Sequence, residues 1–250
     1  MSTCHIGALF CASARNDEAR VLLERAHRLF SFLEDAQMKG VVISHGAQIE
    51  LWNQRWEYGQ KLADASILLV SEYRCDRDLA FSTRLRGEAA LGMGDFAVAI
   101  ECLQDALRRA RTVNFVEEEL HALTSLAELH RQRKEYDATR ELLEEVWPPA
   151  ERGPYPLLHA DARNVLAQLE RDLGNTSAAI EAATTAYRLA WCDGPPYAYH
   201  YGLTNARRHL HELSAPEPQL PPFDKTKFPP MPDVELNPKD EFWVNPDSLD

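Results

Sequence analysis

Residues 93–110 read MGDFAVAIECLQDALRRA, and a disguised copy of this stretch, RKEYDATRELLEEVWPPA, occupies residues 133–150. Both stretches place an aromatic residue fourth, a small residue three positions later and a leucine four positions after that. The two aromatic residues, Phe96 and Tyr136, stand forty positions apart. An interval of forty is therefore the feature to test along the rest of the chain.

Four columns of residues keep step with this interval. The anchor positions are Asn16, Trp56, Phe96, Tyr136 and Thr176. Three residues after the anchors stand Ala19, Gly59, Ala99, Thr139 and Ala179, and nine residues before them Gly7, Ala47, Gly87, Ala127 and Ala167. Seven residues after the anchors stand Leu23, Ala63, Leu103, Leu143 and Ala183, and ten residues after them Ala26, Ser66, Ala106, Val146 and Ala186. The chain therefore contains five copies of one pattern.

The small columns indicate that two helices pass close to each other in every copy. Where antiparallel helices cross, a small side chain on each helix lets the backbones approach, and an aromatic side chain fills the remaining wedge. Gly94 and Gly174 stand two residues before their anchors, where glycine favours the left-handed turn that ends a helix. We therefore predict one helical hairpin per copy.

In these columns the chain resembles the tetratricopeptide repeats. The residues that match the family pattern are Gly87, Gly94-Asp95-Phe96, Ala99, Leu103 and Ala106. The usual period of the family is about 34 residues, so each hairpin here carries an extra helical turn or a longer link, for which WPPAERGPYP at residues 147–156 is a candidate. The resemblance covers about residues 1–190. It implies an all-α fold, a right-handed α-solenoid of five helical hairpins.

The chain after the fifth copy predicts a cap and a tail. Gly194 and two prolines break the chain before an amphipathic segment at about 197–213, which we expect to form a capping helix over the last hairpin. We therefore predict a repeat solenoid with its cap over residues 1–213 and an extended, proline-rich, acidic tail over residues 214–250. Aromatic residues in the tail, such as Phe223 and Trp243, favour docking on the solenoid over a free recognition peptide.

A second resemblance concerns the C-terminal region. DGPPYAYHYGL at residues 193–203 and PPFDKTKFPPMPDVELNP at residues 221–238 look like the ends of bacterial repeat proteins associated with STAND-type ATPases. This resemblance implies an alternative function, a sensor or adaptor module of a bacterial regulatory or defence assembly.

Composition excludes several classes of protein. The formal charge of −12 disfavours nucleic-acid binding, because no strong basic stripe offsets the repulsion of the phosphates. No apolar run is long enough for a membrane span, and the first residues lack the basic region of a signal peptide. Five scattered cysteines without a CxxC pair fit free thiols in a reducing compartment. We expect a soluble, cytoplasmic protein.

No catalytic, metal or cofactor site stands out. Gly92 and Gly94 spell GxG, but no strand precedes them and the repeat pattern accounts for the second glycine. His209 and His211 are two residues apart on a predicted helix and do not converge on a metal, so surface roles are expected for both. No GxSxG elbow marks a nucleophile. The sequence therefore predicts a protein that is not an enzyme.

The family resemblance also gives a candidate binding groove, because the first helix of each hairpin lines the inner wall in this family. The groove positions so inferred are Ser44, Gln48, Leu51, Trp52, Arg84, Glu88, Leu91, His121, Thr124, Glu128, Arg131, Asn164, Gln168 and Arg171. The Lys and Asn clamp that some members use for a C-terminal carboxylate is replaced here, for example by Arg84 and Glu88. Trp52 and the arginines are the best candidates for strong partner contacts, because tryptophan and arginine are enriched at hot spots.

The sequence thus favours a non-catalytic scaffold that binds a peptide or protein partner in its concave groove. Its N-terminal end carries Ile6, Leu9 and Phe10 with almost no charge, so we also expect self-association or a partner contact through an uncapped first helix.

Overall fold

The computed structural model describes residue 10 and residues 12–227. Ten helices and no strand occur in this part of the chain. The helices are α2 (Asn16–Phe32), α3 (Ala36–Trp52), α4 (Trp56–Ser71), α5 (Asp76–Gly92), α6 (Phe96–Thr112), α7 (Val116–Gln132), α8 (Tyr136–Arg152), α9 (Pro156–Asp172), α10 (Thr176–Trp191) and α11 (His200–Glu212). From α2 to α10 a helix begins every 20 residues, so the period of forty in the sequence is one helical hairpin.

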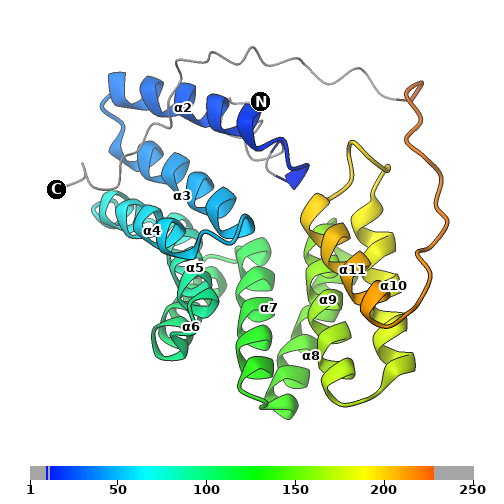
Figure 1. The fold of residues 1–250 in the computed structure, drawn as a ribbon. Helices are drawn as coiled ribbons and strands as arrows, with labels where there is room; N and C mark the ends of the chain where they lie inside the picture. The colour runs from blue at the N-terminus through cyan, green and yellow to red at the C-terminus, as the bar shows by residue number, and fades with distance from the viewer. Residues whose placement is uncertain (1–9, 11, 228–250) are drawn as a thin grey trace. The chain divides into compact units, whose positions relative to one another are not determined.

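The chain divides into two compact units, and the division falls within α7, between Ala122 and Leu123. In the first unit, α2 to α6 pack in chain order, each against the next (Figure 1). In the second unit, α8 to α11 do the same. Odd-numbered helices also contact each other, α3 with α5 and α9 with α11. Neighbour packing of this kind is the arrangement of an α-solenoid, as predicted.

The predicted anchors open the even-numbered helices. Asn16, Trp56, Phe96, Tyr136 and Thr176 are the first residues of α2, α4, α6, α8 and α10. Every residue of the four predicted columns that the structure describes is buried. A Cβ added at Gly87 would lie 2.8 Å from Cγ of Leu103, so α5 and α6 approach as closely as the pattern predicts. The Trp56 ring packs in turn on Gly92, where a Cβ would lie 2.3 Å from the ring.

The turns between helices repeat one backbone geometry. Two residues before a helix start, the chain takes a left-handed conformation at Glu34, Gln54, Arg74, Gly94, Asn114, Lys134 and Gly174. At six of these seven turns the next amide bonds a carbonyl five residues back, as Asp95 N donates to Ala90 O at 2.9 Å, which is the Schellman closure of a helix. Gly94 and Gly174, with φ of +81° and +79°, confirm the predicted turns.

The turn between α8 and α9 is an exception, and it corrects one prediction. The proposed link at residues 147–156 is mostly helical, because α8 extends to Arg152 and includes Pro148 and Pro149. Both prolines lie in the last turns of the helix, so their missing N–H groups remove few of its backbone hydrogen bonds. The actual turn is residues 153–155, and Pro154 at its centre cannot adopt the positive φ that the other turns use.

Helix α11 follows Gly194 and corresponds to the predicted capping helix at about 197–213. The described start of the predicted tail lies against α10 and the loop after it. Trp191 Nε1 donates to the Pro221 carbonyl at 2.9 Å, the Tyr187 hydroxyl donates to Glu217 at 2.8 Å, and the Phe223 ring lies 4.4 Å from that of Tyr197. The proposed division at residue 213 remains a prediction.

The remaining sequence predictions concern the two ends of the chain. Ile6 and Leu9 lie outside the described residues, as does the tail beyond Lys227. Phe10 is buried, and the Arg15 guanidinium lies 4.1 Å above its ring. None of the described helices combines the length and the hydropathy that a membrane span requires.

Candidate binding site

Six of the fourteen predicted groove residues are buried: Ser44, Gln48, Leu51, Arg84, Leu91 and Asn164. Only 1% of Arg84 is exposed; its Nε donates to Glu118 on α7 at 2.7 Å, its Nη1 to Glu88 at 2.7 Å and its Nη2 to Gln48 on α3 at 3.1 Å. Burial lowers the pKa of Arg84, but the charges of Glu118 and Glu88 outweigh it and raise this pKa above its usual value. The charged side chain of Arg84 therefore links three odd-numbered helices, α3, α5 and α7.

Asn164 stands eighty residues after Arg84 in the same repeat position and has a similar place. It is 4% exposed, and its Nδ2 donates to the Gly202 carbonyl on α11 at 3.0 Å. Ser44, in the same column, is also buried and meets Ser66 and Ser82 at hydroxyl distances of 2.7 and 2.8 Å. This polar column faces the neighbouring odd-numbered helix, so its polarity serves packing between repeats.

The other predicted groove residues keep part of their surface exposed: Trp52, Glu88, His121, Thr124, Glu128, Arg131, Gln168 and Arg171. In the second unit, Arg131 on α7 pairs with Glu128 at 2.8 Å and with Asp172 on α9. Arg171 on α9 pairs in the same way with Glu212 on α11. We call Glu128, Arg131, Gln168 and Arg171 the polar face of the second unit.

Ion pairing sets the charge of this polar face. Burial lowers the pKa of Arg131, but the hydrogen bonds and charges of Glu128 and Asp172 outweigh it and raise the pKa above its ordinary value. Each arginine is thus held by carboxylates of its own helix or of the next odd-numbered helix. The polar face presents alternating charges rather than a basic patch.

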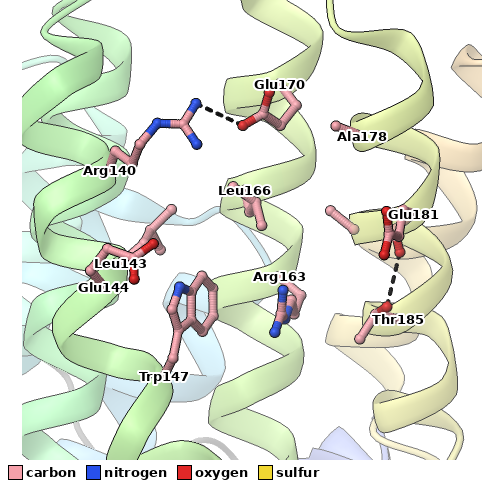
Figure 2. Close-up of a pocket in the computed structure, with 11 residues that line it drawn as sticks. Arg140, Leu143, Glu144, Trp147, Arg163, Leu166, Glu170, Ala178, Glu181 and Thr185 are labelled. Atoms are coloured by element: carbon pink, nitrogen blue, oxygen red, sulfur yellow. Dashed lines mark hydrogen bonds and ion pairs between the residues drawn. The ribbon is translucent and has the colours of Figure 1, made fainter.

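A hollow in the second unit lies elsewhere, between α8 and α10 above α9 (Figure 2). Its volume is about 360 Å³. The residues that line it are Arg140, Leu143, Glu144, Trp147, Arg163, Leu166, Glu170, Ala178, Glu181, Ala182 and Thr185. We call this hollow the α8–α10 cleft. Its α9 residues differ from those of the polar face, so the two surfaces use different sides of that helix.

Both arginines of the cleft are already engaged. Arg140 donates to Glu170 at 2.8 Å. Arg163 lies 4.3 Å from the centre of the Trp147 ring and donates to Nε2 of His159 at 3.0 Å. Burial and the Arg163 charge lower the pKa of His159, which keeps this imidazole neutral and able to accept that bond.

Sequence reasoning missed the cleft because it considered the odd-numbered helices only. One signal was available in the alignment of the copies. Ala182 stands where the earlier copies carry Leu22, Leu62, Cys102 and Leu142. Three of these four earlier residues are leucines, so alanine at this position predicts a hollow at that point of the second unit.

One histidine prediction is wrong. His209 is buried, with 2% of its surface exposed, whereas its neighbour His211 is exposed. Residue 209 lies on the side of α11 that packs into the second unit, a placement that the spacing of the two histidines alone does not reveal. Among the described residues, no group of three or more His, Cys, Asp or Glu side chains is placed to hold a metal ion.

Comparison with protein families matches residues 120–148 to a model described as a tetratricopeptide repeat. The match spans most of α7 and most of α8, which is one hairpin of the series. The described helices are consistent with repeats of this type along the chain. Comparison with curated proteins found no match.

Proposed function

We propose that the tetratricopeptide-repeat hairpins of this chain form a non-catalytic scaffold that binds a peptide or protein partner along the odd-numbered helices. Repeats of this family generally act as protein–protein interaction modules. The proposal concerns the partly exposed residues of the predicted groove. Arg84 and Asn164 are buried, so they support the surface without being part of it.

The observation that carries the proposal is the recurrence of the polar face. Glu128 and Gln168 occupy one repeat position and Arg131 and Arg171 another, and all four side chains remain partly exposed. The columns that hold the hairpins together are buried instead. Packing therefore fixes the scaffold columns, while the polar face offers charged and amide groups in a regular order to a partner.

A cytoplasmic location belongs to the same proposal. Cys75, Cys102 and Cys192 are free thiols, which is the usual state of cysteine in a reducing compartment. Burial raises the pKa of the Cys102 thiol, so this cysteine stays protonated and unreactive at neutral pH.

The test is affinity capture with the full chain, followed by binding measurements with the purified partner. The Arg131→Ala/Arg171→Ala variant should weaken binding by about tenfold or more, because arginine truncation at hot spots removes more than 1 kcal/mol. The control is Arg108→Ala/Arg188→Ala, which removes the same charge from exposed positions on α6 and α10. Equal binding by both variants would contradict the proposal. A partner that carries an ATPase domain would favour the narrower adaptor role.

A further inference from the structure

We propose that the α8–α10 cleft is a second binding site, which takes an arginine or lysine side chain from an extended segment of a partner protein. The stem of the guest side chain would lie on the apolar floor of the cleft, and its charged end would meet the carboxylates of the two walls. This site goes beyond the proposed binding at the polar face and does not depend on it.

The floor of the cleft suits an aliphatic stem. Leu143 and Ala182 are buried beneath it, and Leu166 lies half-buried between the walls (Figure 2). Ala182 lines the cleft where the earlier copies carry larger residues, so its short side chain leaves room there. Arginine and lysine side chains bury their methylene groups on apolar surface while their charge stays near water.

The walls of the cleft favour a cation. Glu144 on α8 and Glu181 on α10 are exposed, and they line the cleft from opposite walls (Figure 2). Neither makes an ion pair within the described part of the chain. The third carboxylate, Glu170, is neutralised by Arg140. The uncompensated charge of the cleft is therefore negative.

Arg163 does not reverse this balance. Its guanidinium stacks on Trp147, and its Nη2 lies 3.6 Å from Glu151, a carboxylate just outside the cleft. The positive charge is thus held against one wall and matched by a carboxylate of its own. An acidic guest would have to compete with Glu151 and would also face Glu144 and Glu181.

Local backbone chemistry adds to this preference. In a regular helix the Glu144 carbonyl would accept a bond from residue 148, but Pro148 has no N–H. On the opposite wall, the Thr185 hydroxyl donates to the Glu181 carbonyl at 2.9 Å, so this donor is already used. The exposed carboxylates of Glu144 and Glu181 can accept from a guanidinium or ammonium group, and these groups are donors only.

The charge of the whole chain acts in the same direction. At −12, it attracts basic segments and repels acidic ones over distances of about 10 Å at moderate salt. A basic partner segment would therefore arrive faster than a neutral or acidic one and would find the two unpaired carboxylates in the cleft.

The experiment uses the full chain, labelled with ¹⁵N, and three synthetic peptides. The first is acetyl-Ala-Leu-Arg-Leu-Ala-amide, and in the other two citrulline or glutamate replaces the arginine. Citrulline keeps the shape of arginine without its charge. We expect saturable shifts of the Trp147 indole N–H and of the amides in residues 178–185 with the arginine peptide, and binding at least about fivefold weaker with the other two.

Two variants of the cleft test whether the peptide binds there. Glu144→Gln/Glu181→Gln changes only surface charge and should weaken the binding of the arginine peptide about fivefold. Its control, Glu57→Gln/Glu101→Gln, removes the same charge from exposed positions on α4 and α6 and should leave binding unchanged. Ala182→Leu restores the residue of the earlier copies, fills the cleft and should abolish the shifts.

The proposal is overturned if the arginine peptide gives no saturable shift, or if the citrulline or glutamate peptide binds as tightly. It is also overturned if the two glutamine variants weaken binding equally. The Arg131→Ala/Arg171→Ala variant separates this site from the proposed function. It should leave peptide binding unchanged, and a loss of binding there would place the peptide on the polar face instead of in the cleft.

Discussion

Arg84 on α5 and Glu118 on α7 form an ion pair inside the first unit. The Nε–Oε2 distance is 2.7 Å, and the exposed fractions of the two residues are 1% and 5%. A buried charge that loses a partner is poorly compensated by water, so removing one member of such a pair is far more destabilising than removing both. After loss of Glu118, Arg84 would keep only Glu88 as a counter-ion. The pair therefore links α5 to α7 in the interior of the first unit.

Glu118→Ala should accordingly lower the free energy of unfolding by about 3 kcal/mol or more. Restoring an apolar match with Arg84→Met/Glu118→Leu should recover most of this loss. The control is Glu119→Ala, since Glu119 pairs with Arg111 at a partly exposed position of the same helix and should change stability by less than about 1 kcal/mol. Urea unfolding followed by circular dichroism measures all three; similar effects of Glu118→Ala and Glu119→Ala would contradict the prediction.

Overpacking tests the hairpin columns. Ala99 on α6 is completely buried and faces α5, so Ala99→Leu should destabilise the chain by about 1–3 kcal/mol by forcing the helices apart. Gly87→Leu should act in the same way, because its Cβ has no room beside Leu103. Ala97→Leu is the matched control, since residue 97 is exposed on the same helix. Thermal unfolding that fails to separate Ala99→Leu from Ala97→Leu would mean that the columns are misassigned.

Protonation of His209 links stability to pH. Burial, with the charges of Arg208, Arg171 and Arg131, lowers the pKa of His209 to about 4. The unfolded chain takes up this proton near pH 6.5 and the folded chain only near pH 4, so the free energy of unfolding should fall by about 3 kcal/mol as the pH drops between these values. Glu212 lies 4.0 Å from Nδ1, but its carboxylate is already paired with Arg171.

The measurement is chemical unfolding at a series of pH values from about 4 to 7.5. His209→Gln should flatten the profile over this window, because the titrating group is gone. His211→Gln, two residues away and exposed, should keep the slope of the unchanged chain. If His209→Gln and the unchanged chain have the same slope, the pH dependence arises elsewhere.

The left-handed turns offer a way to stabilise the chain. Lys134 has φ of +62°, a conformation in which a Cβ is strained, whereas Gly94 occupies the equivalent place in the preceding hairpin without strain. Lys134→Gly should therefore raise the free energy of unfolding by about 0.5–1 kcal/mol, after allowance for the greater freedom of glycine in the unfolded chain. Lys134→Ala removes the side chain without relieving the backbone and should be close to neutral. A gain with alanine equal to that with glycine would show that strain is not the cause.

The described start of the tail should stabilise the second unit. A chain ending at Ser214 loses the Pro221 carbonyl that accepts from Trp191 and the Phe223 ring that covers Tyr197, so both aromatic residues gain solvent. We expect the midpoint of thermal unfolding to fall by several degrees and the tryptophan emission to shift to longer wavelength. A chain ending at Lys227 keeps these contacts. It should therefore show neither the lower midpoint nor the shift in emission that the loss of these contacts causes. Identical behaviour of the two truncated chains would contradict the prediction.

The sequence by itself determined the hairpins. Helices at a fixed spacing need small residues wherever two backbones approach, and this need leaves a column such as Gly87 and Ala127 that is visible without coordinates. The turn glycines can also be recognised from the sequence, because Gly94 and Gly174 adopt a positive φ that is unfavourable for other residues. These requirements are local or recur in every hairpin, so the same residue types recur in the sequence of each copy.

Only the tertiary structure decided which polar residues are buried and where the cleft lies. Arg84 and Arg171 are both arginines on odd-numbered helices, yet one is enclosed by α3 and α7 and the other stays partly exposed. His209 and His211 differ in the same way, because burial depends on what the next helix places over a side chain. The α8–α10 cleft likewise depends on residues from three helices, and only packing brings Ala182 opposite Leu143 and Leu166.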